Sequence, residues 1–346
     1  MRMRQVRPEV EALTEGHVVR LKKLARDERI ATFLEKSRTP LIRPFVEADL
    51  RAGGLQKGHK QLSFWVILLG GIATALGVLH LAWPKHWITV IESGLFGVAA
   101  ILVLVGILGK RHHRWLAARF EAERLRLLLF ELVADPDLWT SDLARRDWQG
   151  YFEKTLRDQT PVNEDNLMTV AANETPPSIW RSDDCKGPEV GHLKALVSFW
   201  DGHVRGQMQY FDVKIEQEKT HRILDNENLG GIVFAVIALL IALHVAFEFT
   251  GKDRLATAFL AGSLAVAAIW AAIRTWRSAN EYSRNARRAE AKRDAIHAHS
   301  KALEAELQRP EPDRAFVFNT LSACAALLRA DQREWLALMV EAEWYG

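Results

Sequence analysis

Ionisable side chains lie inside or near the ends of long apolar stretches of this sequence. Glu92 is the clearest, because it stands about five residues into an apolar run that begins at Trp87. His80, His244 and Glu248 lie near the ends of similar runs. Charged side chains are costly in hydrocarbon, so they tend to face protein or water and to mark ion paths. Repeated around an oligomer, such acids would form a ring that attracts cations.

The same residues also have a plainer interpretation. At 1.5 Å per residue, Glu92 lies roughly 7–8 Å below the end of its run, within reach of lipid headgroups. It can also pair with His80 or Lys85 across the neighbouring turn. The sequence leaves both interpretations open, and they differ in whether Glu92 faces its own helix pair or the centre of an oligomer.

The elements that must position these residues are apolar runs of about 20 residues, the length needed to cross roughly 30 Å of hydrocarbon. The connections "PKH" and "TGKDR" are very short, so consecutive runs must form antiparallel hairpins. We therefore predict an integral membrane protein with two helical hairpins. The predicted transmembrane helices are Leu62–Trp83, Trp87–Gly109, Leu229–Phe249 and Leu255–Ile273.

Lysine and arginine gather at one end of the predicted spans. They are Lys57 and Lys60 before the first span, Lys110 and Arg111 after the second, and Arg274 and Arg277 after the fourth. Loops rich in these residues stay on the cytoplasmic side of a membrane. Both termini and the central region are therefore predicted to be cytoplasmic, with only the two short turns on the other side.

The rest of the chain predicts helices outside the membrane. The helix His112–Val133 is expected to continue directly from the second span, and a charged helix follows the fourth span as far as Gln308. The breaker "RPEPD" then precedes an amphipathic helix over Phe316–Trp344. No segment resembles a strand, so the predicted fold class is all-α, with long cytoplasmic helices attached to the membrane hairpins.

This pattern divides the chain into segments. Residues 1–60 are predicted to be cytoplasmic N-terminal helices, and 61–158 the first hairpin with its following helices. A linker rich in Pro and polar residues covers 159–190. A second helix–hairpin–helix module covers 191–308, and the C-terminal amphipathic helix covers 309–346.

Small residues recur within the apolar runs at a spacing that places them on one helix face. The pairs are Gly71 with Ala75, Ala73 with Gly77, and Ala258 with Gly262. Such residues let helix backbones approach closely inside a membrane. They predict either packing within one protomer or self-assembly into a ring.

A basic cluster follows the fourth span and suggests an anionic partner. Its members are Arg284, Arg287, Arg288, Lys292 and Arg293. Basic residues beside a membrane attract acidic lipids, and the same cluster could hold an anionic ligand. Its plainer role is to anchor the helix on the cytoplasmic side.

Catalysis, metal binding and nucleic-acid binding have little support. The sequence lacks the common nucleotide-binding, zinc-protease and serine-hydrolase motifs, so we expect no enzyme, no metal and no cofactor. The histidine groups His112-His113 and His297/His299 lie in basic stretches and are expected to face solvent or headgroups. A net charge of only +3 argues against a specific nucleic-acid partner, and two distant cysteines predict no disulfide framework.

The sequence resembles the SLATT group of bacterial proteins, which combine a two-span hairpin with flanking cytoplasmic helices. The resemblance rests on "GGIATALGV" at 70–78, "WPKHW" at 83–87 and "RWLAARFEAERLRLLLFEL" at 114–132. A second copy is suggested by "HRILDNENLGGIVFAVIALL" and "RNARRAEAKRDAIHAHSKALEAEL". The sequence departs from the usual arrangement by having two hairpins and no attached nucleotide-binding domain.

The resemblance implies a location in the bacterial inner membrane and a role in antiphage defence. Members of this group are expected to oligomerise into pores, or to damage the membrane, when a nucleotide-linked sensor signals. A homo-oligomer, the lipid bilayer and a separate nucleotide-sensing or signal-producing protein are thus the implied partners. A non-conducting, membrane-anchored scaffold or sensor subunit that recruits a cytoplasmic protein is the alternative.

Overall fold

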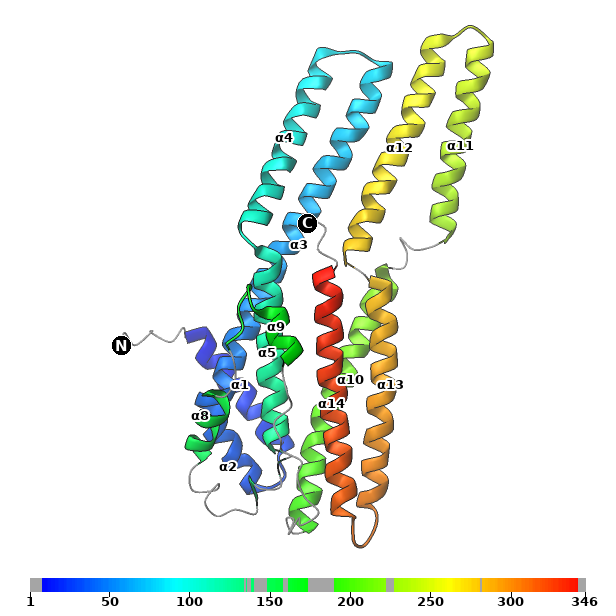
Figure 1. Cartoon of the computed structure of the whole chain (residues 1–346). Helices are drawn as coiled ribbons and strands as arrows, with labels where there is room; N and C mark the ends of the chain where they lie inside the picture. Colours follow the sequence, from blue (N-terminus) through cyan, green and yellow to red (C-terminus); the bar gives the residue numbers. More distant parts are fainter. Residues whose placement is uncertain are drawn as a thin grey trace, which may run out of the picture. The chain divides into compact units, whose positions relative to one another are not determined.

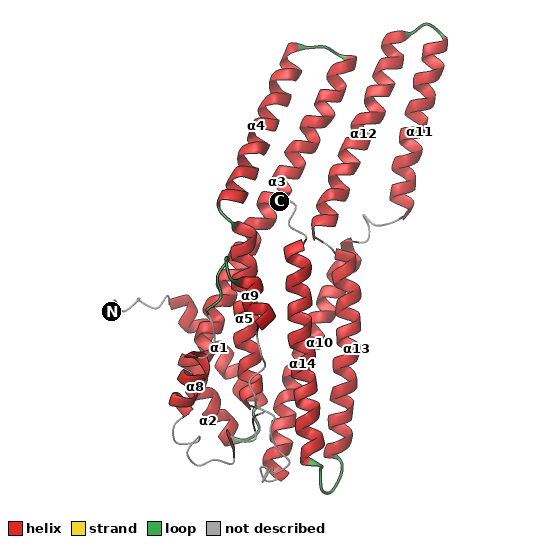
Figure 2. Cartoon of the chain, in the orientation of Figure 1, coloured by secondary structure: helices red, strands yellow, loops and turns green. Residues whose placement is uncertain are grey.

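The computed structural model describes residues 8–133, 135, 138–139, 148–157, 161–173, 190–221, 227–280 and 282–341. These residues form helices and turns with no strand, which confirms the all-α prediction (Figure 2). The chain divides into two compact units, each assembled from separated segments (Figure 1). Unit 1 comprises Met1–Leu55, His113–Val213 and Arg288–Glu341, and unit 2 comprises Gln56–His112, Lys214–Arg287 and Ala342–Gly346.

Unit 1 contains, wholly or for most of their length, the helices other than the four apolar ones. They are α1 (Pro8–Leu24), α2 (Glu28–Ser37), η1 (Arg38–Ile42), α5 (Arg111–Val133), α8 (Trp148–Arg157), α9 (Leu167–Asn173), α10 (Val190–His221), α13 (Tyr282–Leu307) and α14 (Arg314–Glu341). The breaker "RPEPD" separates α13 from α14, as predicted. Helix α9 lies inside the segment predicted as a linker.

Short polar contacts define where helices of unit 1 begin. The carboxylate of Asp27 caps α2 by accepting hydrogen bonds from the backbone N–H groups of Arg29, at 2.7 Å, and Ile30, at 3.4 Å. Asp313 caps α14 in the same way, accepting from the N–H of Phe316 at 3.2 Å. The helix η1 is a π-helix and contains Pro40, which has no N–H to donate to the helical ladder.

The core of unit 1 is rich in large aromatic side chains. Phe33 of α2 is fully buried, and its ring packs against those of Trp139, Trp148 and Phe152. A second buried cluster joins α5, α9 and α14 and includes Trp115, Phe120, Leu167 and Leu336. Helix α9 thus belongs to the core of unit 1.

Unit 2 contains the apolar helices. Four helices of the described residues are long and apolar enough to cross a membrane, as the sequence predicted. They are α3 (Arg43–Ala82), whose first part lies in unit 1, α4 (His86–Leu108), α11 (Glu227–Phe249) and α12 (Asp253–Asn280). Each contains most or all of a predicted span, but α3 begins 19 residues before Leu62, because the helix continues through Gly53, Gly54 and Gly58.

Two short turns join these helices into consecutive pairs, α3 with α4 and α11 with α12. The first turn contains Pro84, which cannot continue helix α3. In the second, Gly251 adopts a φ of +69°, a conformation that only glycine accepts at low cost. Its N–H donates to the carbonyl of Glu248 at 3.0 Å, and the N–H of Lys252 donates to that of Phe247 at 3.0 Å, which closes the end of α11.

One predicted continuity is wrong. Helix α4 ends at Leu108, and α5 begins only at Arg111. Between them, Lys110 adopts a φ of 45°, the left-handed conformation that commonly ends a helix. The second apolar helix and the helix that follows it are therefore two separate helices.

Candidate functional site

Glu92, the residue that raised the possibility of an ion path, lies against its own helix pair. A Cβ atom added to Gly77 of α3 would stand 2.5 Å from Oε1 of Glu92 on α4. The absence of a side chain at Gly77 therefore makes room for the carboxylate. The Glu92 side chain is half-buried in this contact. Among the described residues, Glu92 forms no ion pair with His80 or Lys85, the partners that the sequence suggested.

His80 lies in the same helix pair, near the turn that joins α3 to α4. Its Nε2 atom is 3.4 Å from the hydroxyl of Thr89, which stands one turn before Glu92 on α4. The imidazole thus joins α3 to α4 near the turn at Pro84. The end of this pair nearest Pro84 therefore combines a histidine, a hydroxyl and a carboxylate.

The second helix pair places its polar residues differently. His244 of α11 donates a hydrogen bond from Nδ1 to the carbonyl of Ala256 on α12, at 2.9 Å. Its other ring nitrogen faces the carboxylate of Glu248, one turn further along α11, at 3.5 Å. This arrangement favours the tautomer with a proton on Nδ1. Glu248 is otherwise exposed, so it is the acid of this pair that remains open to its surroundings.

The predicted packing residues of α3 make close contacts within unit 2. A Cβ atom at Gly71 would lie 2.8 Å from the Cβ of Ala272 on α12, so these two helices approach closely at that point. Ala73 and Ala75 are buried. These contacts occur within one chain, which corresponds to the first of the two interpretations that the sequence left open.

On α12 the buried small residues are neighbours of the predicted pair. Ala258 and Gly262 are half-buried, and a Cβ at Gly262 would only touch Leu240 of α11, at 3.9 Å. The buried small residues of this helix include instead Ala256, Ala261, Ser263 and Ala265. A spacing of four does not by itself tell which of several parallel faces of an alanine-rich helix is buried.

The basic cluster after α12 is largely engaged by acidic residues of unit 1. Arg288 binds Asp331 of α14 at 2.9 Å, and Lys292 binds Glu334 at 3.3 Å. Arg293 pairs with Asp212 of α10 and with its neighbour Asp294. Arg287 is exposed, and the side chain of Arg284 lies outside the described residues. Three of the five cations therefore hold helices together inside the protein.

Burial changes the ionisation of one partner in this network. Burial raises the pKa of Asp331 above its usual value, although Arg288 and Lys292 oppose that shift. The loss of hydration therefore disfavours the charged carboxylate more than the two cations favour it. Charge alone in the sequence could not show this, because the acids lie about 40 residues away along the chain.

A buried ion pair in unit 1 was missed by sequence reasoning. Arg329 of α14 forms a two-nitrogen ion pair with the carboxylate of Glu131 on α5, and its Nε is 2.5 Å from Oε1. Both side chains are almost fully buried. One turn further along α14, Gln332 donates to the carbonyl of Phe120 at 2.9 Å. Glu131 ends a leucine-rich stretch, and that is the only signal that this acid would be buried.

Histidines form a second buried polar feature that the sequence did not reveal. His112 was expected to face solvent or headgroups, but it is buried, with its Nδ1 3.3 Å from Nε2 of His59. This expectation was wrong because the α4–α5 break turns His112 toward α3.

In unit 1, burial and the nearby Arg20 and Arg126 lower the pKa of His17 to about 4.

Chemistry beyond packing finds little support in the described residues. They contain no group of three or more His, Cys, Asp or Glu side chains placed to hold a metal ion. The thiol of Cys324 is buried, and burial raises its pKa to about 12, so it is a poor nucleophile. Cys185 lies outside the described residues.

Comparison of the chain with protein-family models, with curated proteins and with solved structures gives no match. The resemblance to the SLATT group therefore stays a prediction that rests on the residues named above. What the geometry offers is a set of apolar helices with ionisable groups near their turns.

Proposed function

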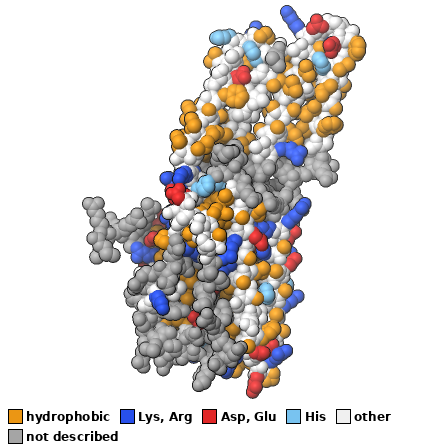
Figure 3. Space-filling model, viewed as in Figure 1, with side chains coloured by type: hydrophobic (Ala, Val, Ile, Leu, Met, Phe, Trp, Pro, Cys, Tyr) orange, Lys and Arg blue, Asp and Glu red, His pale blue; other side chains and the backbone are white. Residues whose placement is uncertain are grey.

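We propose that this chain is a bacterial inner-membrane effector of antiphage defence, whose two helical hairpins assemble with other copies into a pore or otherwise disrupt the membrane. The observation that carries the proposal is the exposure of apolar side chains along the four long helices. Phe249, Leu108 and Phe234 are 89%, 81% and 73% exposed, and apolar side chains spread over this surface (Figure 3). Surfaces of this kind mark interaction with a membrane or a protein.

The proposed topology places both termini and unit 1 in the cytoplasm. It is supported by the concentration of Lys and Arg at one end of the apolar helices, which matches the rule for cytoplasmic loops. A separate nucleotide-sensing or signal-producing protein would then act on unit 1. Helix α3 begins in unit 1 and contains the first apolar segment, so in this proposal it is the helix that carries the signal.

Single cysteines test this topology in a chain whose own cysteines have been replaced. Lys252→Cys, in the turn between α11 and α12, should react with an impermeant maleimide added to intact spheroplasts. Glu311→Cys, in the exposed turn before α14, should react only after the membrane is permeabilised. Labelling of Glu311→Cys in intact spheroplasts would exclude the proposed orientation.

One observation favours a second candidate function, a non-conducting membrane-anchored scaffold. Glu92 fits against Gly77, and His244 hydrogen-bonds across its own helix pair, so these residues serve their own hairpins. A pore needs polar groups that face the centre of an oligomer. The scaffold explains the same helices without that requirement.

Ion efflux from liposomes separates the two functions. The full chain is reconstituted into potassium-loaded vesicles at increasing protein-to-lipid ratio, with and without cyclic nucleotides, and crosslinking reports assembly in the same samples. Efflux that rises with assembly supports the pore, whereas assembly without efflux supports the scaffold. Within a conducting oligomer, Glu92→Gln should change cation selectivity, while Asp253→Asn, an exposed acid in the first turn of α12, serves as the matched control.

A further inference from the structure

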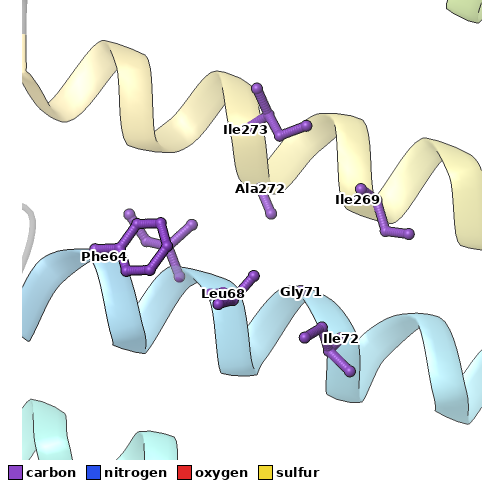
Figure 4. A pocket seen from close by; sticks show the side chains of 8 residues that line it. Phe64, Leu68, Gly71, Ile72, Ile269, Ala272 and Ile273 are labelled. Carbon is purple, nitrogen blue, oxygen red and sulfur yellow. The ribbon is translucent and has the colours of Figure 1, made fainter.

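Apolar side chains of α3 and α12 line a groove in unit 2 (Figure 4). At its floor the two helices come close together, because a Cβ added to Gly71 would lie 2.8 Å from that of Ala272. The groove remains open, since Leu68, Ile72 and Ile269 are 36%, 40% and 47% exposed. Its lining includes Phe64, Leu68 and Ile72 from α3 and Ile269, Ala272 and Ile273 from α12.

Cationic side chains stand at one end of this groove. On α3, Lys60 precedes Phe64 by four residues and Lys57 precedes Lys60 by three, so both lysines continue the helix face that lines the groove. Lys60 is about 6 Å from Phe64 along the helix axis. On α12, Arg274 directly follows the lining residue Ile273. All three cations are exposed.

An apolar groove that ends in cations matches the two parts of an anionic lipid, its acyl chain and its phosphate. The lining from Phe64 to Ile72 extends for about 12 Å along α3, enough for much of a fatty acyl chain. The groove offers such a chain apolar contact along both walls. The lysines and Arg274 offer charge-assisted hydrogen bonds to a phosphate.

We propose that this groove binds one acyl chain of an anionic phospholipid, with the lipid phosphate held by Lys57, Lys60 and Arg274. The proposal rests on the membrane location proposed above, because only a chain embedded in a bilayer meets lipid at this depth. Its cations are different residues from those of the predicted basic cluster at 284–293. A lipid in this position would fill the space between α3 and α12 and stabilise their packing.

Native mass spectrometry of the full chain in mild detergent tests the site. The probes are dioleoyl phosphatidylglycerol and dioleoyl phosphatidylcholine, which share acyl chains and differ in charge. Wild-type protein should bind one phosphatidylglycerol at least about tenfold more tightly than phosphatidylcholine, as expected from the added phosphate–cation contacts. Equal binding of the two lipids would overturn the proposal.

Variants assign the binding to the groove. Leu68→Trp, which places a larger side chain in the groove, should weaken binding of both lipids about fivefold or more, an amount expected when a bulky residue displaces an apolar ligand. Ile101→Trp, at an exposed position of α4, should not. The double variant Lys57→Gln/Lys60→Gln should lose the preference for phosphatidylglycerol, and Lys85→Gln/Lys252→Gln, at the two turns, should keep it.

Other results would show that the groove has another occupant, or that the lipid site or the pore is absent. If Leu68→Trp and Ile101→Trp bind lipid equally, the groove is not the site. If Leu68→Trp instead abolishes a dimer seen in the wild type, a second copy of the chain occupies the groove and the lipid proposal is wrong. Selective binding of phosphatidylglycerol without ion efflux would support this lipid site and exclude the pore. Ion efflux without selective lipid binding would support the pore and exclude the lipid site. Extraction of the chain from membranes by alkaline buffer would exclude both.

Discussion

The two units use apolar side chains in opposite ways. In unit 1, large residues such as Trp139, Trp200 and Phe33 are fully buried, and the Trp200 indole donates a hydrogen bond to the carbonyl of Phe130 within the core. In unit 2, apolar residues such as Phe249 and Leu108 remain exposed, and small residues make the contacts between helices. Water drives the first pattern, whereas the second is expected where lipid surrounds the helices and burial of apolar area offers no gain.

The two units also treat ionisable groups differently. Unit 1 encloses the Glu131–Arg329 pair completely, so that each charge depends on the other. The apolar helices of unit 2 keep Glu92 and His244 near their turns, where each contacts a partner of its own helix pair. Substitutions matched across the two units can sharpen this contrast or break it.

The largest expected effect lies in the buried ion pair of unit 1. Glu131→Leu leaves the Arg329 guanidinium buried without this carboxylate, so the free energy of unfolding should fall by about 3–5 kcal/mol. Chemical denaturation followed by near-ultraviolet circular dichroism measures it. The double variant Glu131→Leu/Arg329→Met should recover most of the loss. Glu304→Gln, which breaks an exposed pair with Arg205, should cost no more than about 1 kcal/mol.

The next effect tests the surface of unit 2 that we propose to face lipid. Leu239 of α11 is 60% exposed, and Leu239→Arg should disfavour membrane insertion by about 2.5–3.5 kcal/mol. The fraction of protein resisting alkaline extraction should fall. Val213→Arg, at a position 55% exposed in unit 1, should leave that fraction unchanged. If the fraction resisting extraction is the same for both variants, the two units do not differ in their contact with lipid.

A smaller effect concerns pH and unit 1. Because the pKa of His17 is lowered to about 4 from 6.5, the unfolded chain binds this proton more readily. Stability contributed by the neutral imidazole is therefore complete above pH 6.5 and is lost as the pH falls toward 4. The loss is about 2 kcal/mol, less than the full shift gives, because the ring is partly exposed and water screens its charge. His17→Gln should flatten this dependence, whereas His297→Gln, at an exposed position, should not. Identical pH profiles for both variants would contradict the assignment.

The smallest expected effect concerns the helix contact of unit 2. Gly71→Ala adds a methyl group 2.8 Å from the Cβ of Ala272, so α3 and α12 must move apart, at a cost of about 1–2 kcal/mol. Gly70→Ala is the matched control, because no neighbouring atom lies within 4 Å of an added Cβ there. Thermal unfolding in detergent should distinguish the variants. A lower midpoint for Gly70→Ala than for Gly71→Ala would show that the contact is absent.

The secondary structure was largely predictable from the sequence. Hydropathy and run length depend on consecutive residues, so the four apolar helices, Pro84 in a turn and the breaker "RPEPD" could be read directly. The α4–α5 break was not predicted, because Lys110 carries no turn signal and adopts its left-handed conformation in the folded chain. Helix α9 was hidden for a related reason, since seven residues give too little periodicity to stand out from a polar segment.

The candidate site was predictable in its residue types and not in its contacts. The sequence by itself determined that Glu92, His80 and His244 stand near the ends of apolar helices, because that follows from their positions along the chain. Only the tertiary structure decided that Glu92 fits against Gly77, that Gly71 meets Ala272, and that Arg329 encloses Glu131. Those contacts join residues from different helices, and the direction and spacing of helices depend on all the packing around them.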